Sequence, residues 1–269
     1  MANLTAWQRV ELARSPKRPT SLDYINNIFD EFIELHGDRY YGDDKSIVGG
    51  LGLLNGIPVT VIGQQKGRNV EENILRNFGM PNPEGYRKVQ RLMKQAEKFN
   101  RPVIHFVDTP GAYPGIGAEE RGQGEAIAQN LMTMSTLKTP IITCVIGEGG
   151  SGGALAQAIA DKVYMLENAI YSILSPEGFA TILWKDATRK KEAAEMMKVT
   201  AADLLKLDVI DQVVEEPEGG LEVEDEDVFN TLKENLHSDI LRLSKLSKNK
   251  LTDLRYKRYR EMGRYNDSN

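Results

Sequence analysis

Apolar residues in this chain alternate between a strand-like and a helix-like spacing, and this alternation restricts the chain to an α/β fold. Two strand-like runs flank Asn55-Gly56, a dipeptide that suits the positive φ angles of a tight hairpin turn. In an α/β core, ligand sites lie in loops after the carboxyl ends of strands. The expected elements are hairpin strands at 47–54 and 57–64, later strands at 102–107 and 140–146, and helices at 83–100 and 118–137.

The same order of strands and helices is expected to recur between residues 147 and 214. Ser175-Pro176-Glu177 is a helix start, and Thr200 with Asp203 forms a capping box for a later helix. The expected elements are a helix at 154–160, strands at 162–166 and 169–174, helices from 176, at 190–197 and after 200, and a strand at 209–214.

Both ends of the chain have helical character. Residues 1–40 place Trp7, Val10 and, after a break, Ile25, Phe32 and Leu35 at helical spacing. Residues 245–264 are basic with interleaved tyrosine and leucine, which indicates a solvated helix or a docking surface for an acidic partner. We therefore expect an N-terminal helical segment (1–40), a core (41–225) and a C-terminal helical extension (226–269).

Composition argues against several classes of protein. The chain has 269 residues, of which 41% are apolar, so it can bury a sizeable core. Its net charge of −5 disfavours nucleic acid as the main partner, since phosphate binding needs clustered lysine and arginine. The single Cys144 and three histidines show no metal-ligand spacing, so we expect no metal in this chain. Without a membrane-spanning run or a signal peptide, it is expected to be cytoplasmic, with no membrane partner.

The segment GEGGSGGALAQAIA, which begins at Gly147, matches the dinucleotide-binding pattern GxGxxG. Gly147, Gly149 and Gly152 fit it, and Glu167 follows at the distance that a ribose contact requires. The helix expected after these glycines has only about eight residues, too few for a crossover on a parallel sheet. We therefore disfavour a nucleotide site.

The same segment also matches GxSxG, in which a strand-to-helix turn presents Ser151 as a nucleophile. A serine hydrolase is therefore the main alternative function. Such an enzyme needs a histidine within reach of the serine. Only His237 follows Ser151, in the charged C-terminal region, whereas His105 lies inside an apolar strand.

A third function of the glycines needs no catalytic side chain. Without Cβ atoms, the backbone can turn sharply and bring several N–H groups to one ligand oxygen, as in an oxyanion hole. The alternative is purely structural, with glycines that serve a tight turn and close helix packing. A non-catalytic scaffold of this kind stays open on the sequence alone.

Three segments together resemble one enzyme family. They are DTPGAYPGIGAEERGQGEAIA from Asp108, VIGEGGSGGALA from Val145, and YSILSPEGFATILW from Tyr171. The chain is similar, over nearly its whole length, to the carboxyltransferase alpha subunits of bacterial acetyl-coenzyme A carboxylase. GQQKGR at 63–68 and LTDLRYKRYR near the C-terminus belong to the same likeness, which is weakest after Glu215.

The resemblance implies a crotonase (ClpP-like) fold of repeated β-β-α units with flanking N- and C-terminal helices. ADLLKLDVIDQVV also resembles a late crotonase segment, although Asp208 stands where a glycine is usual. The implied reaction transfers a carboxyl group from carboxybiotin on the biotin carboxyl carrier protein to acetyl-CoA, which gives malonyl-CoA for fatty acid synthesis. The implied partners are a zinc-ribbon beta subunit in an α2β2 assembly, the carrier and biotin carboxylase.

Site residues follow from the resemblance by position. The backbone N–H groups of Gly152, Gly153 and Ala154 are assigned to a biotin-side oxyanion hole, where negative charge develops. The loop assigned to shape the biotin pocket is Gly111, Ala112, Tyr113, Pro114 and Gly115.

Charged residues beside these segments have open roles. Arg68, Glu119, Arg121 and Glu177 could orient loops or contact the carrier, or form ordinary salt bridges. The expected solvent face of the helix after Pro83 comprises Arg87, Lys88, Arg91 and Lys94, a surface that would also suit CoA phosphates.

Overall fold

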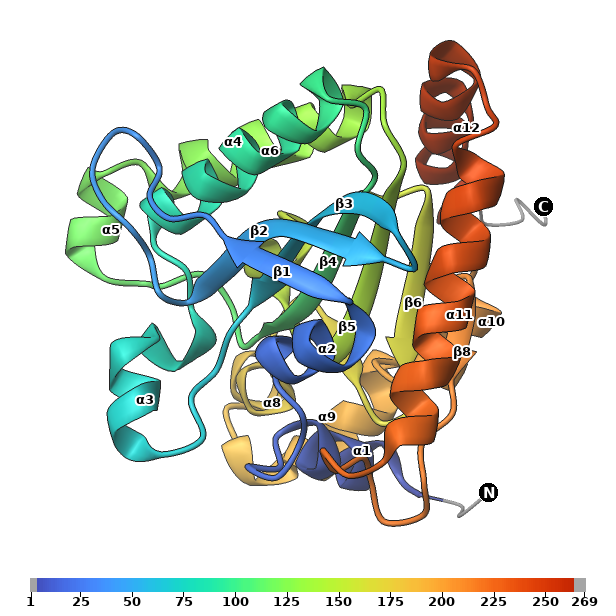
Figure 1. Cartoon of the computed structure of the whole chain (residues 1–269). Helices are drawn as coiled ribbons and strands as arrows, with labels where there is room; N and C mark the ends of the chain where they lie inside the picture. The colour runs from blue at the N-terminus through green and yellow to red at the C-terminus, as the bar shows by residue number, and fades with distance from the viewer. Residues whose placement is uncertain (1–3, 264–269) are drawn as a thin grey trace, which may run out of the picture.

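The computed structural model describes residues 4–263, which form one twisted sheet covered by helices on both faces (Figure 1). The strand order is β1-β2-β3-β4-β5-β6-β8, and β7 pairs with the far end of β5. β1 to β3 are antiparallel, whereas the pairs from β3 onward are parallel. The strands are β1 (Glu31–Glu34), β2 (Ile47–Leu54), β3 (Ile57–Gln64), β4 (Val103–Thr109), β5 (Ile141–Gly150), β6 (Lys162–Leu166), β7 (Ile170–Ser172) and β8 (Gln212–Val214).

The helices follow the strands in the order that the sequence predicts for much of the chain. Proline at the first position starts both α4 and α8, and Thr200 caps α10 by accepting a hydrogen bond from the Asp203 amide. The α-helices are α1 (Ala6–Ala13), α2 (Ser21–Ile28), α3 (Val70–Leu75), α4 (Pro83–Lys98), α5 (Ile116–Glu120), α6 (Gln123–Thr136), α7 (Ser151–Leu155), α8 (Pro176–Trp184), α9 (Lys190–Met197), α10 (Ala201–Lys206), α11 (Glu226–Leu243) and α12 (Lys248–Glu261).

The two helical layers bury opposite faces of the sheet. α4 and α6 lie side by side above the strands in Figure 1, and α4 packs on β2 and β3. α2 packs on the other face and contacts α11, where Tyr24 meets the ring of Phe229 edge-on. Successive side chains of β4 point to opposite faces of the sheet, because Phe106 contacts Tyr24 of α2 whereas His105 hydrogen-bonds to Gln157, in the turn after α7.

The predicted hairpin is confirmed. Asn55 and Gly56 have φ angles of 48° and 77°, which fit a tight turn between β2 and β3. The expected helix over residues 31–34 is wrong, because these residues form β1 and pair with the exposed edge of β2. Glycine permits that pairing: a Cβ on Gly50 would lie 2.0 Å from the Ile33 carbonyl oxygen. The domain boundaries at 40 and 225 stay predictions.

Three further expectations need correction. The helix expected at 118–137 is two helices, α5 and α6, because Gly122 adopts a φ of 82° between them. The strand expected at 140–146 extends to Gly150 as β5, because residues 148–150 pair with β7 and Gly149 also pairs with Thr109, so the turn is confined to the start of α7. The helix expected at 154–160 is the shorter and earlier α7.

None of the helices between residues 4 and 263 has the length and apolar character required to cross a membrane. The cytoplasmic location stays a prediction.

Candidate functional site

The two glycine-rich segments meet at one edge of the sheet because β4 and β5 are adjacent and parallel. The contact between them has no room for a side chain. A Cβ on Gly153 would lie 2.6 Å from the carbonyl carbon of Gly111 and 2.7 Å from the Ala112 nitrogen. A Cβ on Gly150 would lie 2.2 Å from the Pro110 carbonyl oxygen. The structure thus brings together the two segments that the sequence predicts to be functional.

The three residues assigned to the oxyanion hole differ in their surroundings. Gly152 lines an apolar cavity of about 440 Å³, Gly153 is buried against Gly111, and Ala154 belongs to the hydrophobic core. The N–H groups of Gly152 and Gly153 donate no hydrogen bond to a backbone carbonyl of residues 4–263. The Gly153 carbonyl accepts a 2.8 Å hydrogen bond from the buried side-chain amide of Gln64, at the end of β3. This bond holds the first turn of α7 against the sheet.

Ser151 has the backbone geometry of a nucleophile elbow but lacks the partner such a nucleophile needs. Its φ of 50° places a non-glycine residue in the left-handed region, directly between a strand and a helix. Among the described residues no histidine contacts it. His105 is buried and hydrogen-bonds to Gln157, and burial lowers its pKa to about 4. The site does not support a serine hydrolase.

A buried ion-pair network lies behind the two glycine segments. Asp108 and Glu148 stand near the ends of neighbouring strands, and Lys66 bridges them with Nζ–O distances of 2.7 and 2.9 Å. The Glu148 amide also donates to Asp108. Burial alone would lower the pKa of Lys66 and raise that of Glu148, but the opposite charges shift both pKa values the other way. Lys66 thereby holds both strand ends.

Arg14 extends this network to the third segment that carries the family likeness. It caps α1 and contacts Glu148 at 2.7 Å and Glu177, in the first turn of α8, at 2.9 Å. Burial opposes the charged form, yet the two carboxylates raise the pKa of Arg14. The segments that begin at Asp108, Val145 and Tyr171 therefore converge on Lys66 and Arg14.

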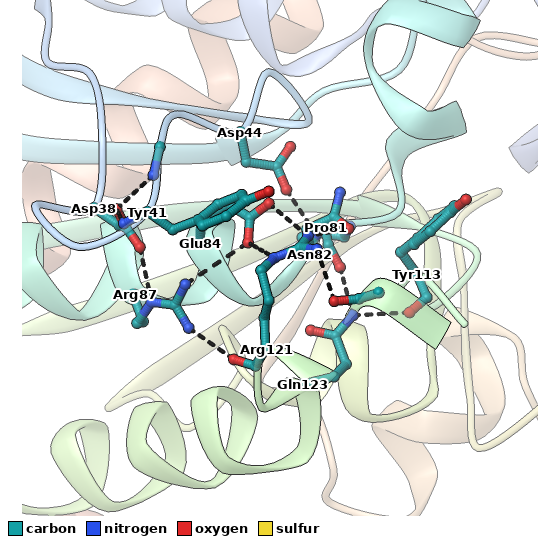
Figure 2. Close-up of polar contacts among 12 residues, drawn as sticks. Asp38, Tyr41, Asp44, Pro81, Asn82, Glu84, Arg87, Tyr113, Arg121 and Gln123 are labelled. Carbon is teal, nitrogen blue, oxygen red and sulfur yellow. Dashed lines mark hydrogen bonds and ion pairs between the residues drawn. The ribbon is translucent and has the colours of Figure 1, made fainter. Parts of the chain in front are cut away.

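The backbone of Tyr113, in the predicted biotin loop, is held by Gln123 of α6, which also binds Pro81 just before α4. Figure 2 shows Gln123 between Pro81 and Tyr113, with hydrogen bonds of 2.9 Å to each carbonyl. The Tyr113 ring, 36% exposed, packs over Gly115, where a Cβ would lie 2.4 Å from it. Pro114 is exposed next to it. The loop is thus anchored by its backbone and presents Tyr113 at the surface.

The four charged residues with open roles are now placed. Arg121 pairs with Glu84 at 2.9 Å and stacks on the Tyr41 ring (Figure 2), and Arg68 pairs with Asp23. Glu177 pairs with Arg14, and Glu119 is exposed on α5. Arg68, Arg121 and Glu177 therefore take part in salt bridges that join segments distant in the sequence.

Lys66, Arg14 and Gln123 are not among the residues that the sequence predicts for the site. A usable signal for Lys66 was present, because two carboxylates near the ends of adjacent strands require a cation between them. No local pattern marks Arg14 or Gln123, whose partners lie far away in the chain. Residues 4–263 contain no group of three or more His, Cys, Asp or Glu side chains placed to hold a metal ion.

The solved structures that share this fold include a transcarboxylase and a malonate decarboxylase. Transcarboxylase 12S matches with a TM-score of 0.67 and 22% identity, over 85% of this chain and 44% of that one. A Pseudomonas malonate decarboxylase hetero-tetramer in complex with coenzyme A matches with a TM-score of 0.70 and 14% identity, over 88% and 92%. These likenesses confirm the expected fold, and they place the chain in the crotonase-like fold class.

Sequence comparisons identify the family within that class. Residues 1–263 match the model of the family "Acetyl co-enzyme A carboxylase carboxyltransferase-like", and the chain belongs to this family. The carboxyl transferase subunit alpha of Clostridium acetobutylicum is 63% identical over 97% of this chain and 96% of that protein. The subunits beta/alpha protein of Natranaerobius thermophilus is 64% identical over 97% of this chain, which spans 43% of that protein's length.

Proposed function

We propose that this chain is the alpha subunit of an acetyl-CoA carboxylase carboxyltransferase, which moves a carboxyl group from carboxybiotin to acetyl-CoA and forms malonyl-CoA for fatty acid synthesis. The family match and the alpha-subunit relatives support this function. The structural observation that carries it is the contact between Gly153 and the Gly111–Ala112 peptide, with N–H groups beside it that donate to no backbone carbonyl of residues 4–263.

Carboxybiotin, when bound, supplies the carboxyl group and an oxygen on which negative charge develops. The N–H groups of Gly152, Gly153 and Ala154 would donate hydrogen bonds to that oxygen. Each such donor, fixed in advance by the fold, contributes roughly 10² to 10³ in rate. No side chain needs to act as a base in this role, which agrees with the lack of a histidine beside Ser151 in the described chain.

The residues around these amides are suited to a biotin group. Gly111, Ala112, Tyr113, Pro114 and Gly115 would shape the pocket, since Gly153 already lies against the first two of them. The cavity beside Ser151 and Gly152 has walls that include Leu155, Tyr171 and Ile173. Apolar walls of this kind exclude water and strengthen hydrogen bonds to a charged oxygen.

A beta subunit would complete the site, in an assembly of two alpha and two beta chains. The name of the Natranaerobius relative joins beta and alpha subunits in one chain, which supports this partner. We assign the zinc ribbon and most contacts to acetyl-CoA to the beta chain. The biotin carboxyl carrier protein and biotin carboxylase would be the other partners.

The test compares this chain alone with the chain mixed with its beta subunit. Malonyl-CoA-dependent carboxylation of biocytin, the reverse reaction, should be negligible for the chain alone and should appear on mixing. Full activity of the isolated chain would contradict the shared site. Absence of activity in a correctly assembled mixture would contradict the proposed function itself.

A further inference from the structure

Gln123 occupies a junction between three segments that are separate in the sequence. It is the first residue of α6 and is almost completely buried. Its Nε2 group donates to the carbonyls of Pro81, before α4, and Tyr113, in the biotin loop (Figure 2). The Tyr113 amide in turn donates a 3.0 Å hydrogen bond to Pro81. Pro81, Tyr113 and Gln123 therefore form a closed set of three hydrogen bonds.

The chemistry of these neighbours fixes the orientation of the Gln123 amide. Both partners are carbonyl oxygens, which only accept hydrogen bonds, so the nitrogen must face them. The Gln123 Oε1 atom is buried and has no partner among the described residues. A buried acceptor without a hydrogen-bond partner lowers the stability of the folded protein. If this position only had to fill space, an apolar side chain of the same size would therefore give a more stable protein than glutamine. Gln123 is thus explained by its two donor hydrogens.

Further ion pairs and hydrogen bonds join the segments on either side of this junction. Arg121, two residues before Gln123, contacts Glu84 in the first turn of α4 and the carbonyl of Gly117 after the loop. Arg87 joins the same helix to Asp38, which accepts backbone hydrogen bonds from the 40–42 turn. Figure 2 shows these contacts as one connected cluster. The segments that hold the Tyr113 backbone are therefore themselves fixed by contacts outside the 111–115 loop.

We propose that Gln123 is a positioning residue that fixes the backbone at Tyr113, and with it the biotin side of the site. This inference rests on the proposed function, in which the Gly111–Gly115 loop shapes the biotin pocket. Loss of both hydrogen bonds frees the Tyr113 carbonyl from α6 and lets the loop move relative to Gly153. A misplaced loop weakens binding of the biotin substrate without changing contacts to the CoA substrate.

Two substitutions test this in the complex with the beta subunit. Gln123→Met removes the donors at similar volume, and Gln123→Glu places carboxylate oxygens against two carbonyls. Both substitutions should raise the KM for biocytin about tenfold, because that is the effect of losing hydrogen bonds of ordinary strength. The KM for malonyl-CoA should change by less than about twofold. The matched control is Gln95→Glu, because Gln95 Oε1 already accepts from Arg101 and a carboxylate keeps that bond.

The outcomes separate the two levels of the proposal. If the wild-type complex is inactive, the proposed function itself is contradicted, whatever the activity of the variants. With an active wild type, an unchanged biocytin KM in Gln123→Met overturns the positioning role. A loss of kcat with both KM values unchanged would show a merely structural role and overturn it as well. Should Gln123→Glu fail to fold, Gln123→Met decides alone.

Discussion

The α-carbon of Gly153 faces the peptide bond between Gly111 and Ala112 so closely that a Cβ there would lie 2.6 Å from the Gly111 carbonyl carbon. Real Cβ atoms essentially never approach backbone atoms to this distance. The first turn of α7 and the loop after β4 are therefore packed directly against each other, so a shift of one segment requires a shift of the other.

Gly153→Val should abolish most of the turnover. The branched side chain must push the Gly111–Ala112 peptide away and displace the amides that we propose as donors to the reacting oxygen. We expect kcat for biocytin carboxylation to fall by about 10² or more, with the beta subunit still bound. Gly153→Ala should give a smaller loss in the same direction, measured in the same assay.

Gly124→Ala is the matched control for the glycine substitutions. Gly124 lies in α6 with nothing within 4 Å of its would-be Cβ, so alanine there should raise the free energy of unfolding by up to about 1 kcal/mol and leave kcat unchanged. Wild-type turnover in Gly153→Val would remove the oxyanion-hole assignment and favour a non-catalytic scaffold.

Ser151→Ala should retain carboxyl transfer within about twofold, because the Ser151 hydroxyl has no catalytic partner in the described chain and the proposed donors are backbone amides. Ser151→Gly should be more stable, by about 1 kcal/mol, since the left-handed φ of 50° is strained for serine. Chemical denaturation measures the second effect. Covalent labelling of Ser151 by a fluorophosphonate, together with ester hydrolysis that is lost in Ser151→Ala, would instead establish the hydrolase.

The parts of the fold that could be predicted are those set by local sequence. The backbone preferences of Asn55 and Gly56 are sufficient to predict the hairpin, and the preference of proline for the first helical position is sufficient to predict the start of α4 at Pro83. Asp208, which stands where a glycine is usual in the late crotonase segment, adopts a φ of 56°. This left-handed conformation is one that favours glycine, although an aspartate occupies it here.

The parts that could not be predicted depend on distant partners. Phe32 and Leu35 have helical spacing, but residues 31–34 form β1 because the edge of β2 is available to pair. Lys88 was expected on the solvent face of α4, yet it is fully buried, with hydrogen bonds to Asp43 and the Ile47 carbonyl. The sequence predicts which two glycine segments form the site, but their contact at Gly153 depends on the order of the strands in the sheet, which no local pattern shows.

Glu148→Gln should destabilise the protein by about 3 kcal/mol at pH 7, because it removes one partner from the buried pairs with Lys66 and Arg14. Although burial raises the pKa of Glu148, its two cations hold it below the ordinary value of 4.5. The stabilisation is therefore complete above pH 4.5 and is lost as the pH falls through the lowered pKa. Urea unfolding of both proteins should show the difference shrinking below pH 4.5.

The control for Glu148→Gln is Glu119→Gln, on the exposed face of α5, which should change the free energy of unfolding by less than about 0.5 kcal/mol at any pH. A pH-independent difference between wild type and Glu148→Gln would show that the Glu148 carboxylate is not stabilised by Lys66 and Arg14.

Tyr259→Phe tests how α12 supports the cavity beside Gly152. The Tyr259 hydroxyl donates to the Ala158 carbonyl and accepts from the Ala160 amide, both at 2.8 Å, and the side chain lines the cavity. Phenylalanine leaves both backbone groups without this partner, so the free energy of unfolding should fall by about 1–2 kcal/mol. Tyr256→Phe, one turn away and 68% exposed, should change it by less than about 0.5 kcal/mol. Equal effects of the two substitutions in thermal unfolding would mean that the hydroxyl of Tyr259 does not hold α12 against the turn after α7.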